Sequence, residues 1–241
     1  MMVDEATPFL SVIIPAYNEE NRLGPTLVRI KEYLGQQDYT SEIVVVDNAS
    51  KDRTIEVAKA AGVDVIEEPR RGKGAAVRTG MLAAKGELVL FSDADLSTPI
   101  EEIEQLLAAL ESGHDVAIAS RALPDSKLVK RQPWYREMVG RLGNLLVRLM
   151  AVHGIADTQC GFKLFPREIA QRVFPAQRLT GAAFDVEVLF IVQHMGGKIA
   201  EVPVTWIDSP DTRFNRVRDS LDALKDLVRI RMNWLLGRYR V

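Results

Sequence analysis

Two aspartates, two residues apart, are the first candidates for chemistry in this sequence. Asp93 and Asp95 belong to the run SDAD, which follows the apolar run LVLF, where a buried strand would end. Carboxylate oxygens are the ligands that Mg²⁺ and Mn²⁺ prefer, and one or two carboxylates commonly hold such a cation together with substrate phosphates. The pair is therefore a candidate metal site. The structural alternative is a capped turn with one solvated carboxylate.

Two further segments carry groups that suit a nucleotide. Asp47 ends the run VVVD, where a carboxylate can accept a hydrogen bond from a ribose hydroxyl or a base N–H. Its alternative role is to cap the helix that begins near Lys51. Residues 71–74 (RGKG) lie between an expected strand and an expected helix, where backbone N–H groups and cations suit a phosphate. The Walker A spacing is absent, and the segment is equally compatible with a simple turn.

The elements that would position these groups alternate along the chain. Short apolar runs rich in β-branched residues predict strands, and apolar residues three or four apart predict helices. The predicted strands are 10–15, 42–47, 63–67, 87–92, 115–120 and 198–206. The predicted helices are 19–34, 54–61, 72–84, 99–111, 134–152, 167–174, 184–195 and 216–234. This alternation predicts an α/β fold with a mostly parallel sheet, whose ligands lie at the carboxyl ends of the strands.

The composition excludes several classes of protein. The 241 residues contain one cysteine, Cys160, so an intramolecular disulfide and a cysteine-rich zinc site are excluded. The net charge of −2 argues against general nucleic-acid binding. Residues 6–18 form the longest stretch without charge and are too few to span a membrane. The N-terminus does not resemble a signal peptide, and we expect a cytoplasmic protein.

The charges are unevenly distributed along the chain. Residues 121–148 carry seven Lys and Arg against two acidic residues, and residues 213–240 carry eight against three. Cations concentrated in this way suit an anionic partner. The alternative is that each segment forms a solvated helix face.

Four motifs in order resemble the nucleotide-sugar domain of the family 2 inverting glycosyltransferases, whose fold is GT-A: SVIIPAYNEE, VVVDNASKDRT, RRGKGAAVRTG and FSDADLS. Four later motifs narrow the likeness to enzymes that glycosylate polyprenyl or dolichyl phosphate, above all the dolichyl-phosphate glucosyltransferases: ASR, DTQCGFKLF, FDVEVLF and EVPVTW. The resemblance covers residues 9–214. It implies a GT-A domain over residues 1–214, with a Rossmann-like, mostly parallel sheet flanked by helices. An amphipathic helical tail over residues 215–241 would follow.

The resemblance also implies roles for individual residues. The nucleotide sugar would be bound by Pro15, Tyr17, Glu19, Asp47, Lys73, Asp93 and Arg213. Asp93 and Asp95 would hold Mg²⁺ or Mn²⁺. Ser97 stands where the family often has a Gln ligand, so a third metal ligand is not assigned. Asn48 stands where the family often has a second Asp, and no role is carried over to it.

The implied reaction is attack by a lipid phosphate oxygen on the anomeric carbon of the nucleotide sugar, with inversion. A phosphate with a second pKa of about 6 is already largely ionised at neutral pH, so alignment and neutralisation of the leaving diphosphate matter most. The acceptor phosphate would contact Arg121 and Arg131, with Arg136 as the alternative to Arg131. Asp95, Arg121 and Asp157 are the expected catalytic residues. Asp157 acts as a base, orients a sugar hydroxyl or caps a turn.

The favoured prediction is transfer of glucose from UDP-glucose to a polyprenyl or dolichyl phosphate at the cytoplasmic face of a membrane. GDP-mannose and UDP-GlcNAc are the alternative donors, and a nucleotidyltransferase or a nucleotide-sugar-binding regulator is the competing function. Cations of the tail helix would attract anionic headgroups, or the helix would form a homodimer contact. Residues 142–152 would lie in the membrane interface or pack on the sheet. Glu187 would contact the sugar or cap a helix.

Overall fold

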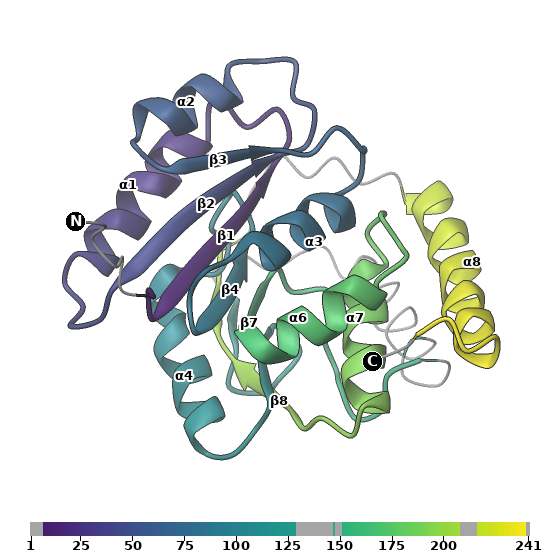
Figure 1. Ribbon diagram of the computed structural model, residues 1–241. Coiled ribbons are helices and arrows are strands. Elements are labelled where there is room, and N and C mark those ends of the chain that lie inside the picture. The colour runs from purple at the N-terminus through teal and green to yellow at the C-terminus, as the bar shows by residue number, and fades with distance from the viewer. Residues whose placement is uncertain (1–6, 129–146, 148–150, 208–215, 240–241) are drawn as a thin grey trace, which may run out of the picture.

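The computed structural model describes residues 7–128, 147, 151–207 and 216–239, with the backbone alone described for 216–223 (Figure 1). Three predicted site residues, Arg131, Arg136 and Arg213, lie outside the described residues. So does most of the predicted helix 134–152, including eight residues of the segment 142–152. At the end of that segment, Ala151 and Val152 are described and are buried in the core. The expected phosphate contacts of the three arginines and the expected membrane contacts of the segment stay predictions.

A seven-stranded sheet runs through the middle of the molecule in the order β3-β2-β1-β4-β7-β5-β8. Its strands are β1 Leu10–Ala16, β2 Ser41–Asp47, β3 Asp64–Glu67, β4 Leu88–Ser92, β5 Val116–Ser120, β7 Phe162–Pro166 and β8 Ile199–Pro203. Only β7 runs antiparallel to its neighbours β4 and β5, and the other pairs are parallel. The mostly parallel sheet that the sequence predicts is confirmed.

Helices cover both faces of this sheet, so the core has two parts. The helices are α1 Leu23–Leu34, α2 Thr54–Ala60, α3 Lys73–Ala83, α4 Ile103–Glu111, α6 Arg167–Ala176, α7 Phe184–His194 and α8 Arg216–Leu235, with a 3₁₀ turn η1 at Ile100–Glu102. Side chains of α1, α2 and α4 pack on one face. Those of α3, α6 and α7 pack on the other, where α8 joins them at the edge (Figure 1). None of the described helices has the length and apolar character needed to cross a membrane.

The sequence prediction was wrong at β7, which it placed partly in a loop. The strand is short, and Lys163 interrupts its apolar pattern, so periodicity gives it a weak signal. Lys163 is nevertheless buried, because its ammonium donates hydrogen bonds to the Asp185 carboxylate and the Cys160 carbonyl. The predicted strand 198–206 also divides, since Thr205–Trp206 (β9) pairs with Lys127–Leu128 (β6) in a separate small sheet.

A glycine allows α3 to lie close against β1 and β2. A Cβ atom on Gly80 would overlap the Ile13 side chain and lie 2.8 Å from Val46 Cγ2. Gly80 is therefore a spacer between the helix and the strand edge that carries Asp47.

We expect Gly80→Ala to destabilise the fold by ~1–3 kcal/mol, because overpacking outweighs the helix propensity that alanine gains. Urea unfolding measures this change. Gly24→Ala is the matched control, because its new Cβ would meet Val57 Cγ1 at an ordinary 3.6 Å. Equal stability changes in the two variants would contradict the spacer role.

Candidate active site

Two pockets open side by side at the carboxyl ends of β1 and β4, and Asp93 and Asp95 line both of them. The larger, about 450 Å³, is called the Tyr17 pocket and is lined by Pro15, Ala16, Tyr17, Glu19, Arg22, Asn48, Arg71, Gly72, Lys73, Ala76, Asp93, Ala94 and Asp95. The smaller, about 150 Å³, is called the Trp206 pocket and is lined by Ser92, Asp93, Asp95, Leu96, Ser97, Thr98, Arg121, Gln159, Gly161 and Trp206. The two aspartates thus stand where two ligands could meet.

The Tyr17 pocket gathers most of the residues predicted to bind the nucleotide sugar. Pro15, Tyr17 and Glu19 come from the end of β1 and the turn after it, and Lys73 begins α3. The Arg71 guanidinium lies over the Tyr17 ring, 4.0 Å from its centroid. This stack places a cation and a flat aromatic surface in one wall, which suits a nucleotide.

Asp47 ends β2 with a buried carboxylate that is only partly satisfied. Its Oδ2 accepts a hydrogen bond from the Ser50 N–H at 3.1 Å, whereas its Oδ1 is buried without a partner among the described residues. A buried acceptor without a partner is costly, and a ligand N–H or O–H would satisfy it. Asp47 does not itself line the Tyr17 pocket, but the adjacent Asn48 does.

Asn48 stabilises the loop that precedes Lys73. Its Nδ2 donates to the carbonyls of Glu68 and Arg70, and its Oδ1 accepts from the Gly72 N–H at 2.7 Å. A carboxylate could not donate the first two bonds, so an asparagine is the residue type that this loop requires. Glu68 stabilises the same loop, because its carboxylate accepts hydrogen bonds from Arg70. These bonds lower the pKa of the Glu68 carboxyl to about 2.

Lys73 is held at the boundary of the two pockets by Asp93. Its Nζ lies 2.6 Å from Asp93 Oδ1 and 5.2 Å from the centroid of the Phe91 ring. Burial alone would lower the pKa of Lys73, but the nearby carboxylates, Asp93 foremost, outweigh it and raise that pKa. The side chain therefore carries a full positive charge beside the candidate metal ligands.

Lys163 is one of the residues near the site that the sequence reasoning missed, and Gly161 and Trp206 of the smaller pocket are others. Its ammonium lies 5.5 Å from the Phe91 ring centroid and pairs with Asp185 of α7, so Phe91 has a buried lysine as well as Lys73 beside it. Lys163 and Asp185 lie in the motifs DTQCGFK and FDVEVLF. Their membership of these motifs was the signal in the sequence that could have identified them.

A tight turn after β4 orients the two aspartates. The Leu96 N–H donates to the Asp93 carbonyl, and the Ser97 N–H donates to Asp95 Oδ1 at 3.1 Å. Leu96 has a φ of 47°, a left-handed conformation that is strained for a leucine and is held by this turn. The described residues contain no cluster of three acidic, His or Cys side chains that could hold a metal. Two carboxylates together with substrate phosphates still fit Mg²⁺ or Mn²⁺.

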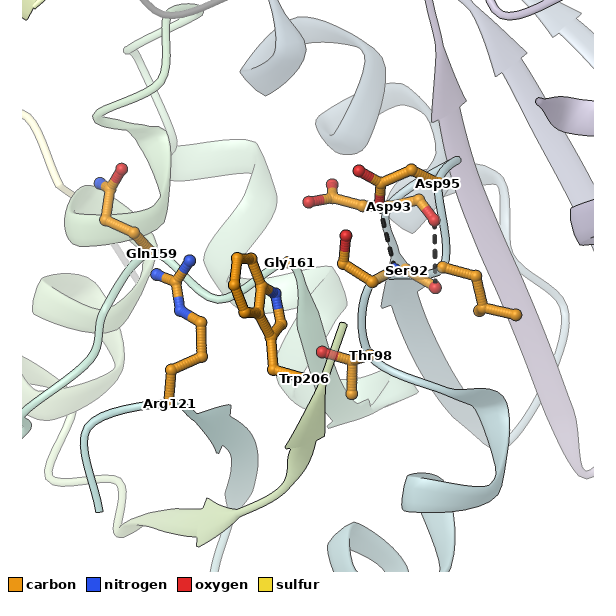
Figure 2. A pocket seen from close by; sticks show the side chains of 10 residues that line it. Ser92, Asp93, Asp95, Thr98, Arg121, Gln159, Gly161 and Trp206 are labelled. Atoms are coloured by element: carbon orange, nitrogen blue, oxygen red, sulfur yellow. Dashed lines mark hydrogen bonds between the residues drawn. The ribbon is translucent and has the colours of Figure 1, made fainter. Parts of the chain in front are cut away.

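Arg121 faces these aspartates across the Trp206 pocket (Figure 2). Asp157 binds its guanidinium through two bonds, Nε to Oδ2 at 2.7 Å and Nη2 to Oδ1 at 2.9 Å. Asp157 also accepts the backbone N–H groups of Arg121 and Gln159. Although burial would raise the pKa of Asp157, Arg121 outweighs it and lowers that pKa. The Asp157 carboxylate therefore orients Arg121, with both oxygens already accepting hydrogen bonds.

Glu187 lines neither pocket, although the sequence suggested a sugar contact or a helix cap. It is buried, and its carboxylate accepts the N–H groups of Arg178 and Leu179 and the Tyr239 hydroxyl at 2.6 Å. Thr180, which follows Arg178 and Leu179, accepts the Gly74 N–H with its backbone carbonyl. Glu187 thus ties the C-terminal residues and α7 to the start of α3.

Gly161 gives Asp93 its position. The Asp93 N–H donates to the Gly161 carbonyl at 3.0 Å, and a Cβ atom on Gly161 would overlap the Asp93 carboxylate. Any side chain at this position would displace one of the two candidate metal ligands.

We expect Gly161→Ala to weaken Mn²⁺ binding in the presence of UDP by at least about tenfold, a change of ~1.4 kcal/mol. Electron paramagnetic resonance of the bound metal measures it. Gly181→Ala is the control, because its new Cβ would meet nothing within 4 Å. Unchanged Mn²⁺ affinity in Gly161→Ala would contradict the role of Gly161 in positioning Asp93 for the metal.

The fold of this chain is similar to that of solved structures. The glucosyl-3-phosphoglycerate synthase of Mycobacterium tuberculosis, in complex with Mn²⁺, UDP and glucosyl-3-phosphoglycerate, superimposes with a TM-score of 0.67 at 24% identity. The match covers 97% of this chain and 81% of that chain. The GT-A fold that the sequence motifs imply is thereby confirmed.

The sequence of this chain is similar to a family model and to curated relatives. Residues 11–174 match the family described as Glycosyl transferase family 2. The dolichyl-phosphate beta-glucosyltransferase of Dictyostelium discoideum is 35% identical over 251 residues, covering 97% of this chain and 77% of the relative. The human dolichyl-phosphate beta-glucosyltransferase is 36% identical over 257 residues, covering 99% and 79%. The chain therefore belongs to glycosyl transferase family 2 and is a glycosyltransferase.

Proposed function

We propose that this glycosyltransferase transfers glucose from UDP-glucose to dolichyl phosphate or a related polyprenyl phosphate, with inversion at the anomeric carbon. The observation that carries the proposal is the position of Arg121 in the Trp206 pocket. The buried Asp157 holds Arg121 there, facing Asp93 and Asp95. A planar guanidinium fixed in this way suits a phosphate acceptor. The relatives named as dolichyl-phosphate beta-glucosyltransferases support the same acceptor and sugar.

The Tyr17 pocket supports the donor half of the proposal. Its volume and the Tyr17 ring suit a nucleoside, and Lys73 suits the diphosphate. The unsatisfied Asp47 oxygen lies behind the pocket, next to its lining residue Asn48. Asp93 and Asp95 would hold Mg²⁺ or Mn²⁺, which would neutralise charge on the leaving diphosphate. The Mn²⁺ and UDP in the structural relative support this choice of cofactor and base.

The acceptor half needs no general base. A phosphate monoester is largely ionised at neutral pH and can attack without losing a proton, so its alignment is the main requirement. Arg121 would align that phosphate, and Asp157 would keep Arg121 in place. A positioning role for Asp157 agrees with its hydrogen bonds, because both of its carboxylate oxygens already accept N–H donors.

The exposed face of α8 supports attachment to a membrane surface, which we assign to the cytoplasmic face. Leu224, Val228 and Leu235 lie on one stripe of the helix and are exposed, with Lys225 and Arg229 beside them. An apolar stripe flanked by cations is typical of helices that lie in a membrane interface. A homodimer contact through the same face is the alternative.

We expect the purified chain, supplied with Mg²⁺ or Mn²⁺ and a short polyprenyl phosphate, to form a glycolipid with UDP-glucose and not with UDP-GlcNAc or GDP-mannose. Mass spectrometry detects the product. Asp95→Asn is expected to lower kcat at least about 100-fold because a metal ligand is lost. Asp38→Asn, an exposed change in another loop, is the control.

Glycolipid from GDP-mannose or UDP-GlcNAc alone would reject the proposed sugar but keep the reaction. Metal-dependent UDP binding without any product would favour the nucleotide-sugar-binding regulator. Family membership already argues against a nucleotidyltransferase.

Replacing both Leu224 and Leu235 with Asp is expected to weaken binding to anionic phospholipid vesicles at least about tenfold, because two apolar contacts become charged. Vesicle co-sedimentation measures the change, with Leu82→Asp on α3 as the control for an exposed leucine. Membrane binding that is unchanged by the double variant, with a monomer replacing a dimer in sedimentation, would identify the stripe as a homodimer contact instead.

A further inference from the structure

A large groove lies between α8 and the segment that leads into α7. It has a volume of about 1280 Å³ and belongs to neither pocket of the active site. Four buried side chains, Leu179, Ala183, Val186 and Leu227, form its apolar floor. Such a floor suits a hydrocarbon rather than a nucleotide or a sugar.

The rim of the groove is cationic. Arg178, Arg229 and Arg238 line it and are exposed, and Asp226, paired with Arg229, is the acidic residue among the described lining. An apolar floor with a positive rim matches a molecule that has a hydrocarbon chain and an anionic end. It does not match a purely apolar or a purely ionic ligand.

The groove adjoins the active site at Gln159. This residue lines both the groove and the Trp206 pocket, where it stands next to Arg121 (Figure 2). A phosphate at Arg121 would therefore have its hydrocarbon chain directed past Gln159 toward the groove.

We propose that this groove binds the isoprenoid chain of the acceptor, in the units next to the phosphate. This inference rests on the proposed acceptor class, and it places the chain between α7 and α8. The Trp206 pocket, at about 150 Å³, has room for the reacting groups, whereas the groove is about 1280 Å³ and has room for a chain. The rim cations would attract the phosphate before it reaches Arg121.

The test is binding of farnesyl phosphate to the full chain, measured by calorimetry without any sugar donor. Two variants change the groove at exposed positions: Ala182→Trp fills it, and Met232→Glu puts a negative charge at its edge. Each is expected to weaken farnesyl phosphate binding at least about tenfold and to leave UDP binding unchanged. Farnesol and inorganic phosphate, which each lack one half of the probe, are expected to bind far more weakly.

Matched controls exclude general effects of the substitutions. Val28 on α1 is 55% exposed, close to the 53% of Met232, so Val28→Glu is the charge control. Ala60→Trp at the end of α2 is the size control. Arg229→Glu is expected to weaken binding of farnesyl phosphate but not of farnesol, because the rim acts on the phosphate.

Wild-type affinity in both groove variants would overturn the inference, and so would absence of farnesyl phosphate binding to the unmodified chain. The proposed function is tested separately by turnover. One combined outcome separates the two proposals. If the groove variants weaken farnesyl phosphate binding but no donor yields a glycolipid, the proposed function is rejected and the groove remains a site for isoprenoid phosphates.

Discussion

The contact between Asp93 and the Gly161 backbone is the constraint on which the active site depends. It exists because β7 is antiparallel in an otherwise parallel sheet. The residues before β7, and not those after it, therefore reach the carboxyl ends of β4 and β5. That arrangement brings Asp157 and Gln159 beside the aspartates that follow β4, and it requires a residue without a side chain where the loop meets Asp93.

Paired charges fix the rest of the site. Lys73 pairs with Asp93, Lys163 with Asp185, and Arg121 with Asp157. Lys163–Asp185 is the fully buried pair, and removing one partner from such a pair costs about 3–5 kcal/mol, whereas the intact pair adds little net stability. Lys73, Asp93 and Arg121 are partly exposed in the other two pairs. These pairs therefore serve to hold cations and carboxylates in defined places, with Lys73 and Arg121 on either side of the two aspartates.

Much of this arrangement could be predicted from the sequence, because it depends on local patterns. The runs that precede Asp47 and Asp93 are apolar and short, so the strands and the carboxylates at their ends followed from periodicity. β7 could not be predicted in this way, since the buried Lys163 charge is paired with Asp185, 22 residues away. The same limit applies to Asn48, which binds backbone carbonyls 20 and 22 residues away, and to Glu187, which binds the Tyr239 hydroxyl 52 residues away.

The position of β7 in the sheet also has a consequence for synthesis of the chain. By residue 92 the ribosome has produced the strands β1 to β4, which pair as neighbours. The free edge of β4 finds its partner only when residues 162–166 follow, some seventy residues later. Until then the nascent half-sheet presents unpaired backbone groups beside apolar side chains, a surface on which chains associate wrongly. Slow elongation between residues 92 and 162 would prolong that exposure. Translation speed and chaperone binding should therefore affect the yield of folded enzyme.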